Sequence, residues 1–301
     1  MILSYHSFAK INWTLEVLGK RADGYHEIRT ILQTIDLHDD VTLESAPKEV
    51  SVRCSDPGVP ADSSNLAHRA ATLLRDHRKL DLGVRITIEK RIPPGGGLGG
   101  GSSNAAVTLM GLDRLWGTGL RTAEFLSLAR QLGSDVPFFL TGGTAIGVGR
   151  GDEIYPLPDR PAPFLIIVTP PVRVSTRDAY SRLLTSSGPT SKICDSCVTV
   201  FRDSGAPLAI SEEAVPSGLS QNDFETVILN EFPEIRKAYE QMGSCGATVV
   251  RLCGSGSSVV GSFSSEQGRE RSTRGWPPHW SVFPAATLTR SEYRRQLFAN
   301  P

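Results

Sequence analysis

The segment at residues 93–104 has a composition suited to binding an anion. Six of the seven residues from 95 to 101 are glycine, and Ser102 and Ser103 follow directly. Glycine lets backbone N–H groups approach a ligand closely, and the apolar spacing after it predicts a helix whose N-terminus adds positive potential. The natural ligand of such a loop is a polyphosphate.

Two other phosphate-binding motifs fit this loop poorly. A P-loop needs a lysine followed by Ser or Thr after its last glycine, whereas Gly101 is followed by Ser102. Residues 95–100 contain the glycine spacing of a dinucleotide fingerprint, but Asp113 follows too closely to bind a ribose. A glycine-rich surface turn without a ligand remains an open alternative.

Lys10, Asn12 and Asp135 are polar residues at positions where chemistry is possible. Lys10 lies on a predicted strand among apolar neighbours, where a buried lysine needs an anionic partner. Asn12 shares its face of the strand, and Asp135 lies in a predicted loop where it could act as a general base. Each also has an ordinary explanation: an edge-strand lysine, a turn amide, and a loop-capping or surface carboxylate.

Tyr25 and His26 directly follow a predicted turn at Asp23 and Gly24. An aromatic ring beside an imidazole suits stacking on a nucleobase and hydrogen bonding to its edge. From spacing alone, surface residues of a hairpin are an equally good interpretation.

The glycine loop resembles a known family signature. Residues 94–106 resemble the Pro-x-x-x-Gly-Leu-Gly-Ser-Ser-Ala motif of the GHMP kinases, and residues 252–258 resemble the third motif of that family. Residues 9–12 and 21–28 are similar to the substrate-side motifs of one member. Further similar segments lie at 65–66, 132–139 and 222–225, so that the similarity runs from residue 7 to about residue 263.

The resemblance implies a kinase that transfers the γ-phosphate of ATP to a substrate hydroxyl, with Mg²⁺ bridging the phosphates. It implies that Asp135 accepts the hydroxyl proton and that Lys10 pairs with Asp135 and touches the accepting hydroxyl. It identifies no protein ligand for Mg²⁺. Ser102 or Ser103 could supply a hydroxyl, and either could equally cap the following helix.

Residues 94–104 and Asn65 are the positions where the resemblance implies ATP binding, although helix capping alone would explain Asn65. In full these are Asn65, Pro94, Gly95, Gly96, Gly97, Leu98, Gly99, Gly100, Gly101, Ser102, Ser103 and Asn104.

The motif with Tyr25 and His26 selects the family member whose substrate is a cytidine diphosphate-linked methylerythritol. That member phosphorylates the 2-hydroxyl in non-mevalonate isoprenoid precursor synthesis. Tyr180 is expected to give the second face of a cytosine sandwich, and the third motif is expected to contact substrate diphosphate or nucleotide phosphates. The residues expected to bind substrate are Asn12, Tyr25, His26, Tyr180, Gly254, Ser255 and Gly256.

The residue pattern predicts mostly β-structure over the first 50 residues, then a helix after Asn65, a strand at 84–88, the glycine loop with its helix, and a helix at 122–132. Strands are expected near 164–169, 247–252 and 258–263, and helices near 176–184 and 222–242. The resemblance implies an α+β fold of two domains: residues 1–158, like ribosomal protein S5 domain 2, and residues 159–301, a ferredoxin-like GHMP domain. The site should lie between them, and residues 186–220 should form an exposed insertion.

The composition excludes several classes of partner. In 301 residues, 32 basic side chains balance 32 acidic ones, which gives no charge signal for nucleic acid or membrane. The longest apolar runs fall far short of the roughly 20 residues that span a bilayer, and no signal peptide is evident. We expect a cytoplasmic monomer or homodimer. Five scattered cysteines argue against a disulfide framework, and Cys194 and Cys197 form an incidental close pair.

Two alternative functions stay open at this stage. One is another GHMP kinase acting on homoserine, mevalonate or a sugar, none of which carries a cytosine. The other is a catalytically silent protein of the same fold that binds a nucleotide or metabolite. The presence of both Lys10 and Asp135 argues against the silent protein.

Overall fold

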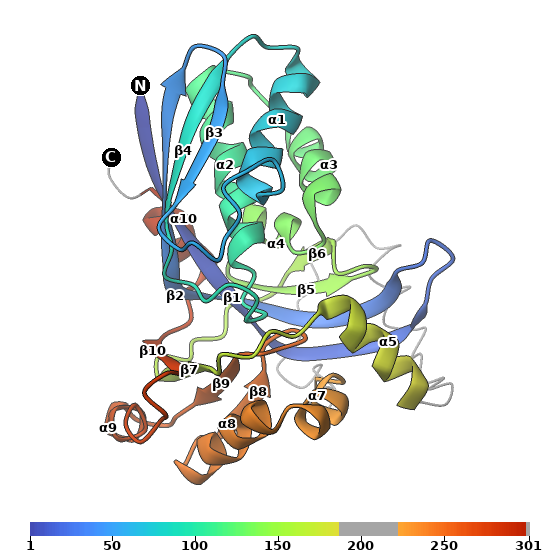
Figure 1. The fold of residues 1–301 in the computed structure, drawn as a ribbon, viewed down its shortest axis with the longest axis vertical. Helices are drawn as coiled ribbons and strands as arrows, with labels where there is room; N and C mark the ends of the chain where they lie inside the picture. Colours follow the sequence, from blue (N-terminus) through green and yellow to red (C-terminus); the bar gives the residue numbers. More distant parts are fainter. Residues whose placement is uncertain (187–221, 299–301) are drawn as a thin grey trace.

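The computed structural model describes residues 1–186 and 222–298 (Figure 1). Its larger sheet has six strands in the order β3-β4-β2-β5-β6, with β1 paired to β2. The strands are β1 (Ile2–Lys20), β2 (His26–Ala46), β3 (Val50–Cys54), β4 (Gly83–Glu89), β5 (Thr144–Val148) and β6 (Glu153–Pro156). All neighbours are antiparallel except β3 and β4, which are parallel.

The second sheet has four strands, all antiparallel, in the order β10-β7-β9-β8. They are β7 (Leu165–Thr169), β8 (Val249–Leu252), β9 (Val259–Ser262) and β10 (Ser281–Ala285). Every residue of β7 is buried, as its unbroken apolar sequence predicts for a central strand.

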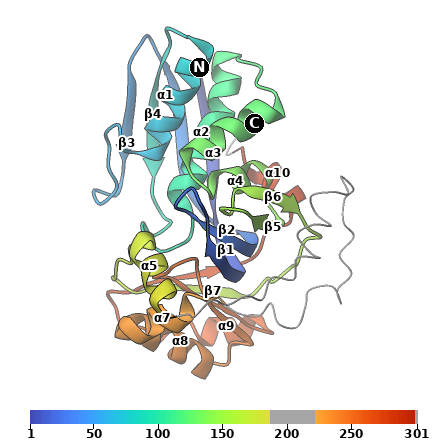
Figure 2. The same cartoon turned by 90° about the vertical axis from the view of Figure 1, so that its right-hand side faces the viewer.

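Helices cover one side of each sheet (Figures 1 and 2). Against the larger sheet lie α1 (Leu66–Arg78), α2 (Gly100–Trp116), α3 (Thr122–Leu132) and α4 (Val136–Thr141). With the second sheet lie α5 (Thr176–Ser186), α7 (Glu225–Glu231), α8 (Pro233–Ser244) and α9 (Glu266–Arg271). The short α10 (Arg290–Gln296) returns to the larger sheet, where Tyr293 and Leu297 are buried in its core.

The β1–β2 hairpin links the two halves of the fold. Its strands are 19 and 21 residues long, and their far end projects beyond β5 and alongside α5 (Figure 1). Leu15 of β1 forms a bridge to Asn222, and the backbone N–H of Asp223 donates to the Leu15 carbonyl at 2.9 Å. The residues before the hairpin turn therefore lie beside the start of α7.

A small buried cluster joins the glycine loop to both sheets. Ile11 of β1, Leu98 of the loop and Ile167 of β7 belong to it, together with Cys253 and Val260. The loop is therefore held between the sheets rather than projecting from one of them.

The expected α+β fold of the GHMP kinases is confirmed, with differences in detail. The predicted helix at 222–242 is two helices, α7 and α8, because Pro233 lacks the N–H that would continue the first one. Asp135 directly precedes α4, a helix the sequence pattern did not indicate. The domain boundary at residues 158 and 159 falls between β6 and β7 and stays a prediction.

Two predictions concern residues that the structure does not describe. The expected insertion at 186–220 lies outside the described residues apart from its first residue, and so do Cys194 and Cys197. Among the described helices, none is both long and apolar enough to cross a membrane.

Candidate active site

Lys10 is buried in β1 and faces Asp135. Its Nζ lies 3.5 Å from Asp135 Oδ2, and only 4% of its side chain is exposed. The backbone N–H of Lys10 donates to the Leu98 carbonyl at 2.9 Å, which ties the strand to the glycine loop. The structure therefore gives Lys10 the anionic partner that its burial requires.

Asp135 lies at the N-terminal end of α4, but its side chain does not cap the helix. Its side chain is 37% exposed, so the carboxylate is open on one side while Lys10 neutralises it on the other. A carboxylate in this position can accept a proton from an incoming hydroxyl.

Asn12 holds Lys10 in place. Its Oδ1 accepts hydrogen bonds from Lys10 Nζ at 2.8 Å and from the Gly254 N–H at 2.9 Å. Its Nδ2 donates to Thr30 Oγ1 at 2.7 Å, and the side chain is buried. Asn12 thus contacts Lys10 and the third motif directly, and its contact with substrate stays a prediction.

The glycine loop is packed so tightly that side chains would not fit at several positions. Gly97 has a φ of +77°, and a Cβ there would lie 1.9 Å from the Cys253 carbonyl oxygen. A Cβ at Gly99 would meet the ring of Phe139 and the side chain of Lys10. Glycine is needed at these positions both for the backbone angles and for the close approach of the neighbouring chain.

The backbone N–H groups of residues 95–102 are free. Within the described residues, none of them donates a hydrogen bond to a protein acceptor. They lie at the start of α2, where the helix dipole adds positive potential. A row of free donors at a helix N-terminus is the arrangement that binds phosphate oxygens.

A cavity of about 620 Å³ adjoins this loop. Its walls include residues 93–102, Asn104, Asn65 and Leu66, and also residues that the sequence did not single out: Gly58, Val59, Pro60, Ser64, Lys90, Arg173, Val174 and Thr176. The volume suits a nucleotide. Lys10 and Asp135 do not line it; Lys10 packs against Gly99 at the end of the loop.

The polar residues predicted near the nucleotide differ in how free they are. Asn65 Oδ1 caps α1 by accepting from the Ala67 N–H at 2.9 Å, so the capping explanation is confirmed, although Asn65 also lines the cavity. Ser102 lines the cavity and its hydroxyl makes no hydrogen bond among the described residues. Ser103 is buried against Ser7, whose hydroxyl donates to it at 2.8 Å, and does not reach the cavity wall.

The third motif forms a loop between β8 and β9 that touches both the glycine loop and Asn12. The Ser258 N–H donates to the Gly96 carbonyl at 3.1 Å, and Ser255 Oγ lies 3.0 Å from Thr176 Oγ1. Asn222 Nδ2 donates to the Gly254 carbonyl at 2.7 Å. Asn222 was missed as a site residue, although it belongs to the segment 222–225 that resembles the family.

Tyr25, His26 and Tyr180 lie at the far end of the β1–β2 hairpin and on α5. The rings of His26 and Tyr180 stack directly, with centroids 4.5 Å apart and planes 10° apart. A base between two rings needs them about 7 Å apart, so a cytosine sandwich between these two requires their separation. Tyr25 is 55% exposed, with the Arg150 guanidinium over its ring.

The ring of His26 carries an unsatisfied polar atom. Its Nε2 is buried and has no hydrogen-bond partner among the described residues. Burial, with the positive charge of Lys20, lowers the pKa of His26 and favours the neutral ring. Burial also raises the pKa of Tyr180 to about 12, with a smaller contribution from the negative charge of Asp135.

Comparison with known proteins identifies the family. The GHMP kinases N terminal domain matches residues 65–143, and the GHMP kinases C terminal domain matches residues 197–278. A 4-diphosphocytidyl-2-C-methyl-D-erythritol kinase of Gloeobacter violaceus is 42% identical over 257 residues, which cover 84% of this chain and 83% of the relative. The chain belongs to this family of GHMP kinases. A kinase with the same name from Geobacillus kaustophilus is 39% identical over 277 residues, covering 91% and 93% of the two chains.

Solved structures agree with this assignment. A crystal structure of 4-(cytidine 5'-diphospho)-2C-methyl-D-erythritol kinase is 30% identical with a TM-score of 0.75, and the match covers 95% of this chain and 99% of the other. Homoserine kinase from Cytophaga hutchinsonii, at 18% identity, has a TM-score of 0.65 over 96% of this chain and 95% of its own. The second likeness concerns the fold alone. The expected GHMP kinase family is confirmed; the roles of individual residues stay predictions.

Proposed function

We propose that this GHMP kinase transfers the γ-phosphate of ATP to the 2-hydroxyl of 4-diphosphocytidyl-2-C-methyl-D-erythritol, giving the 2-phosphate and ADP. This is the step of non-mevalonate isoprenoid precursor synthesis expected from the sequence. The observation that carries the proposal is the Lys10–Asp135 pair beside a loop of free N–H donors, in a chain about 40% identical to kinases of that name.

Phosphoryl transfer to an alcohol depends mostly on positioning and charge stabilisation. The free N–H groups of residues 95–102 bind the triphosphate, and Asp135 takes the proton from the attacking hydroxyl. Lys10, fixed by Asn12, stabilises the negative charge on the transferring group and on Asp135. Asn12 and Asn222 hold the start of the loop at 254–258 through hydrogen bonds to the N–H and the carbonyl of Gly254.

Magnesium fits the donor groups at this site. Mg²⁺ in kinases takes few protein ligands besides substrate phosphates and water. We assign the Ser102 hydroxyl, which lies on the cavity wall, as the protein ligand of Mg²⁺. Ser103 is less suitable because its hydroxyl accepts a hydrogen bond from Ser7. Bound Mg²⁺ would neutralise phosphate charge.

The cytidine end of the substrate is assigned to the hairpin tip. His26 has a buried Nε2 with no hydrogen-bond partner in the described part of the chain, which a cytosine edge can satisfy, and Tyr25 is exposed for stacking. The homodimer or monomer state and the cytoplasmic location expected from the sequence stay predictions.

A substrate panel tests the proposal. Purified protein with Mg-ATP is offered the diphosphocytidyl substrate, homoserine and mevalonate, and ADP release is followed. Turnover of the diphosphocytidyl substrate alone supports the proposal. Turnover of homoserine or mevalonate would assign the chain to another GHMP activity, and no turnover with any alcohol would favour a silent binder.

A further inference from the structure

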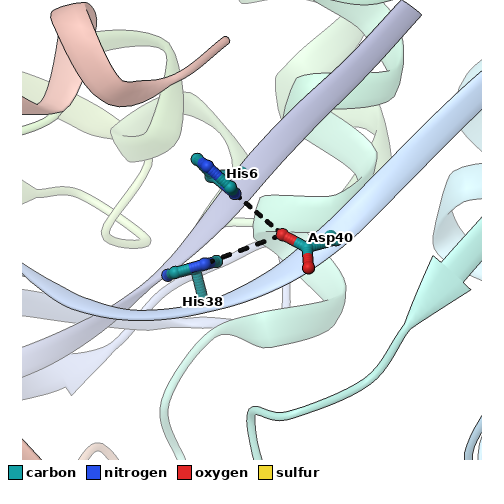
Figure 3. A group of neighbouring side chains, drawn as sticks. All are labelled: His6, His38 and Asp40. Atoms are coloured by element: carbon teal, nitrogen blue, oxygen red, sulfur yellow. Dashed lines mark hydrogen bonds and ion pairs between the residues drawn. The ribbon is translucent and has the colours of Figure 1, made fainter. Parts of the chain in front are cut away.

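A second group of chemically capable side chains lies outside the proposed active site, on β1 and β2. His6 and His38 converge on one carboxylate oxygen of Asp40 (Figure 3). His6 Nδ1 lies 2.7 Å and His38 Nε2 lies 3.6 Å from Asp40 Oδ1. The three side chains are between 26% and 29% exposed, so solvent reaches the group.

The strand pairing fixes the three residues next to one another. His6 is directly opposite Asp40 in the antiparallel β1–β2 ladder, and His38 precedes Asp40 by two residues, which puts it on the same face. Phe8 packs edge-on against both imidazole rings, with centroids 6.0 and 5.3 Å away. The group is therefore built on the most extensively paired strands of the fold.

A backbone carbonyl fixes which ring nitrogen of His38 carries the hydrogen. Its Nδ1 lies 2.8 Å from the Asp36 carbonyl oxygen, which can only accept a hydrogen bond, so Nδ1 carries the hydrogen. In the neutral ring, Nε2 then presents a lone pair toward Asp40. A histidine whose second nitrogen donates to a backbone carbonyl is the usual arrangement for a metal ligand.

A cation already contacts two of these three side chains, His38 and Asp40. Arg91 Nη1 lies 3.1 Å from His38 Nε2, and Arg91 Nη2 donates to Asp40 Oδ2 at 2.6 Å. The Arg91 side chain is 52% exposed, so it can leave for solvent at small cost. The backbone N–H of Arg91 stays bonded to Asp39 Oδ1, which keeps the approach to the glycine loop in place.

We propose that His6 Nδ1, His38 Nε2 and the Asp40 carboxylate bind a zinc ion, which replaces the Arg91 guanidinium. His6 then carries its hydrogen on Nε2. Two imidazole nitrogens and a carboxylate suit zinc, whereas Mg²⁺ prefers oxygen ligands alone. Tetrahedral zinc with bonds of about 2.0–2.1 Å sets its ligand atoms about 3.3 Å apart. The distances from Asp40 Oδ1 to His6 Nδ1 and to His38 Nε2, 2.7 and 3.6 Å, lie on either side of that value.

Calorimetric titration of the full chain with zinc chloride, in the absence of nucleotide, tests the site. All titrations use a chain that also carries Cys194→Ser and Cys197→Ser, so that zinc binding by this close thiol pair does not obscure binding at the proposed site. We expect one zinc ion per chain. His6→Asn and His38→Asn should each weaken binding at least about tenfold, and Arg91→Ala should tighten it because the competing cation is gone.

His77→Asn is the matched control, because His77 also lies beside a carboxylate, that of Glu124, but in a different part of the surface. It should leave the zinc isotherm unchanged, and thermal melts without zinc verify that each variant is folded. Co²⁺ bound in place of zinc would provide an independent test. Its tetrahedral absorption bands should appear with the wild type and be lost in His38→Asn. Zinc affinity that is the same in wild type, His6→Asn and His38→Asn would overturn the proposal, as would Arg91→Ala binding zinc no more tightly.

Discussion

Lys10 Nζ and Asp135 Oδ2 lie 3.5 Å apart, yet 4% of the lysine side chain and 37% of the aspartate side chain are exposed. The lysine is fixed by Asn12 and by packing against Gly99, while the carboxylate stays open. A general base must meet a mobile substrate, whereas its counter-ion works best when it is fixed. The unequal exposure suits this division of roles.

Asp135→Asn should lower kcat by roughly 10²–10⁴-fold, because the amide cannot accept the hydroxyl proton. The KM for ATP should change little, since Asp135 does not line the nucleotide cavity. Steady-state kinetics of the purified variant measure both values. Asp81→Asn is the control, a surface aspartate paired with Lys48, and should behave as wild type. Equal kcat for Asp135→Asn and wild type would rule Asp135 out as the base.

Asn12→Leu should lower both kcat and stability, because it leaves Lys10 and the Gly254 N–H without their shared acceptor. A lost buried acceptor costs about 1–3 kcal/mol, measurable by urea unfolding. Asn12→Asp keeps the acceptor oxygen and should retain more of kcat than Asn12→Leu. Equal loss of kcat in the two variants would show that Asn12 does not act through Lys10.

The lowered pKa of His26 predicts how stability changes with pH. Because the folded chain binds this proton more weakly than the unfolded chain does, protonation favours unfolding. The stabilising contribution is complete above the unfolded pKa of about 6.5 and is lost as the pH falls toward the folded value. The Tm of the wild type should therefore fall more than that of His26→Gln on acidification across this range. A parallel fall in both would contradict the assignment.

Replacing His26 should affect binding of the diphosphocytidyl substrate but not binding of ATP. Removing the ring in His26→Ala should raise the KM for the diphosphocytidyl substrate while leaving the KM for ATP close to wild type, because His26 is not part of the nucleotide cavity. Initial-rate measurements with each substrate varied in turn separate the two. A raised KM for ATP alone would contradict the placement of cytidine at the hairpin tip.

Gly97→Ala should impair nucleotide binding and stability more than Gly117→Ala. Both glycines have positive φ, +77° and +63°, so both variants bear a backbone cost of roughly 1–2 kcal/mol. Of these two, only at Gly97 would the new Cβ collide with a neighbouring backbone, the Cys253 carbonyl, whereas no atom of a described neighbour lies within 4 Å of a Cβ at Gly117. Thermal melts with and without ATP compare them. Equal melting temperatures and equal ATP-induced shifts would show that the close packing of the loop is unimportant.

The sequence predicted the parts of this site that depend on backbone and motif. The glycine run before a helix predicted the row of free donors, and burial of Lys10 among apolar residues predicted an anionic partner. The resemblance named Asp135 as that partner, which spacing alone could not do, because α4 brings it to β1 from far along the chain.

Side-chain packing set the limit of prediction. The rings of Tyr180 and His26 stack directly, without the gap that an inserted base would need. This depends on ring orientations that the periodicity of the sequence does not encode. Likewise, Ser102 and Ser103 are equivalent in the sequence, and only the facing hydroxyl of Ser7 separates their surroundings. The cavity residues Lys90 and Arg173 come from segments distant in the chain, with no motif to mark them.

The most direct measurement is ³¹P NMR of the reaction products formed by wild type and by Asp135→Asn from Mg-ATP and the diphosphocytidyl substrate. We predict that the wild type produces a new phosphomonoester signal together with ADP, that homoserine and mevalonate give none, and that the variant loses the signal while remaining folded. A phosphomonoester formed equally well by Asp135→Asn, or formed only from another alcohol, would contradict the account.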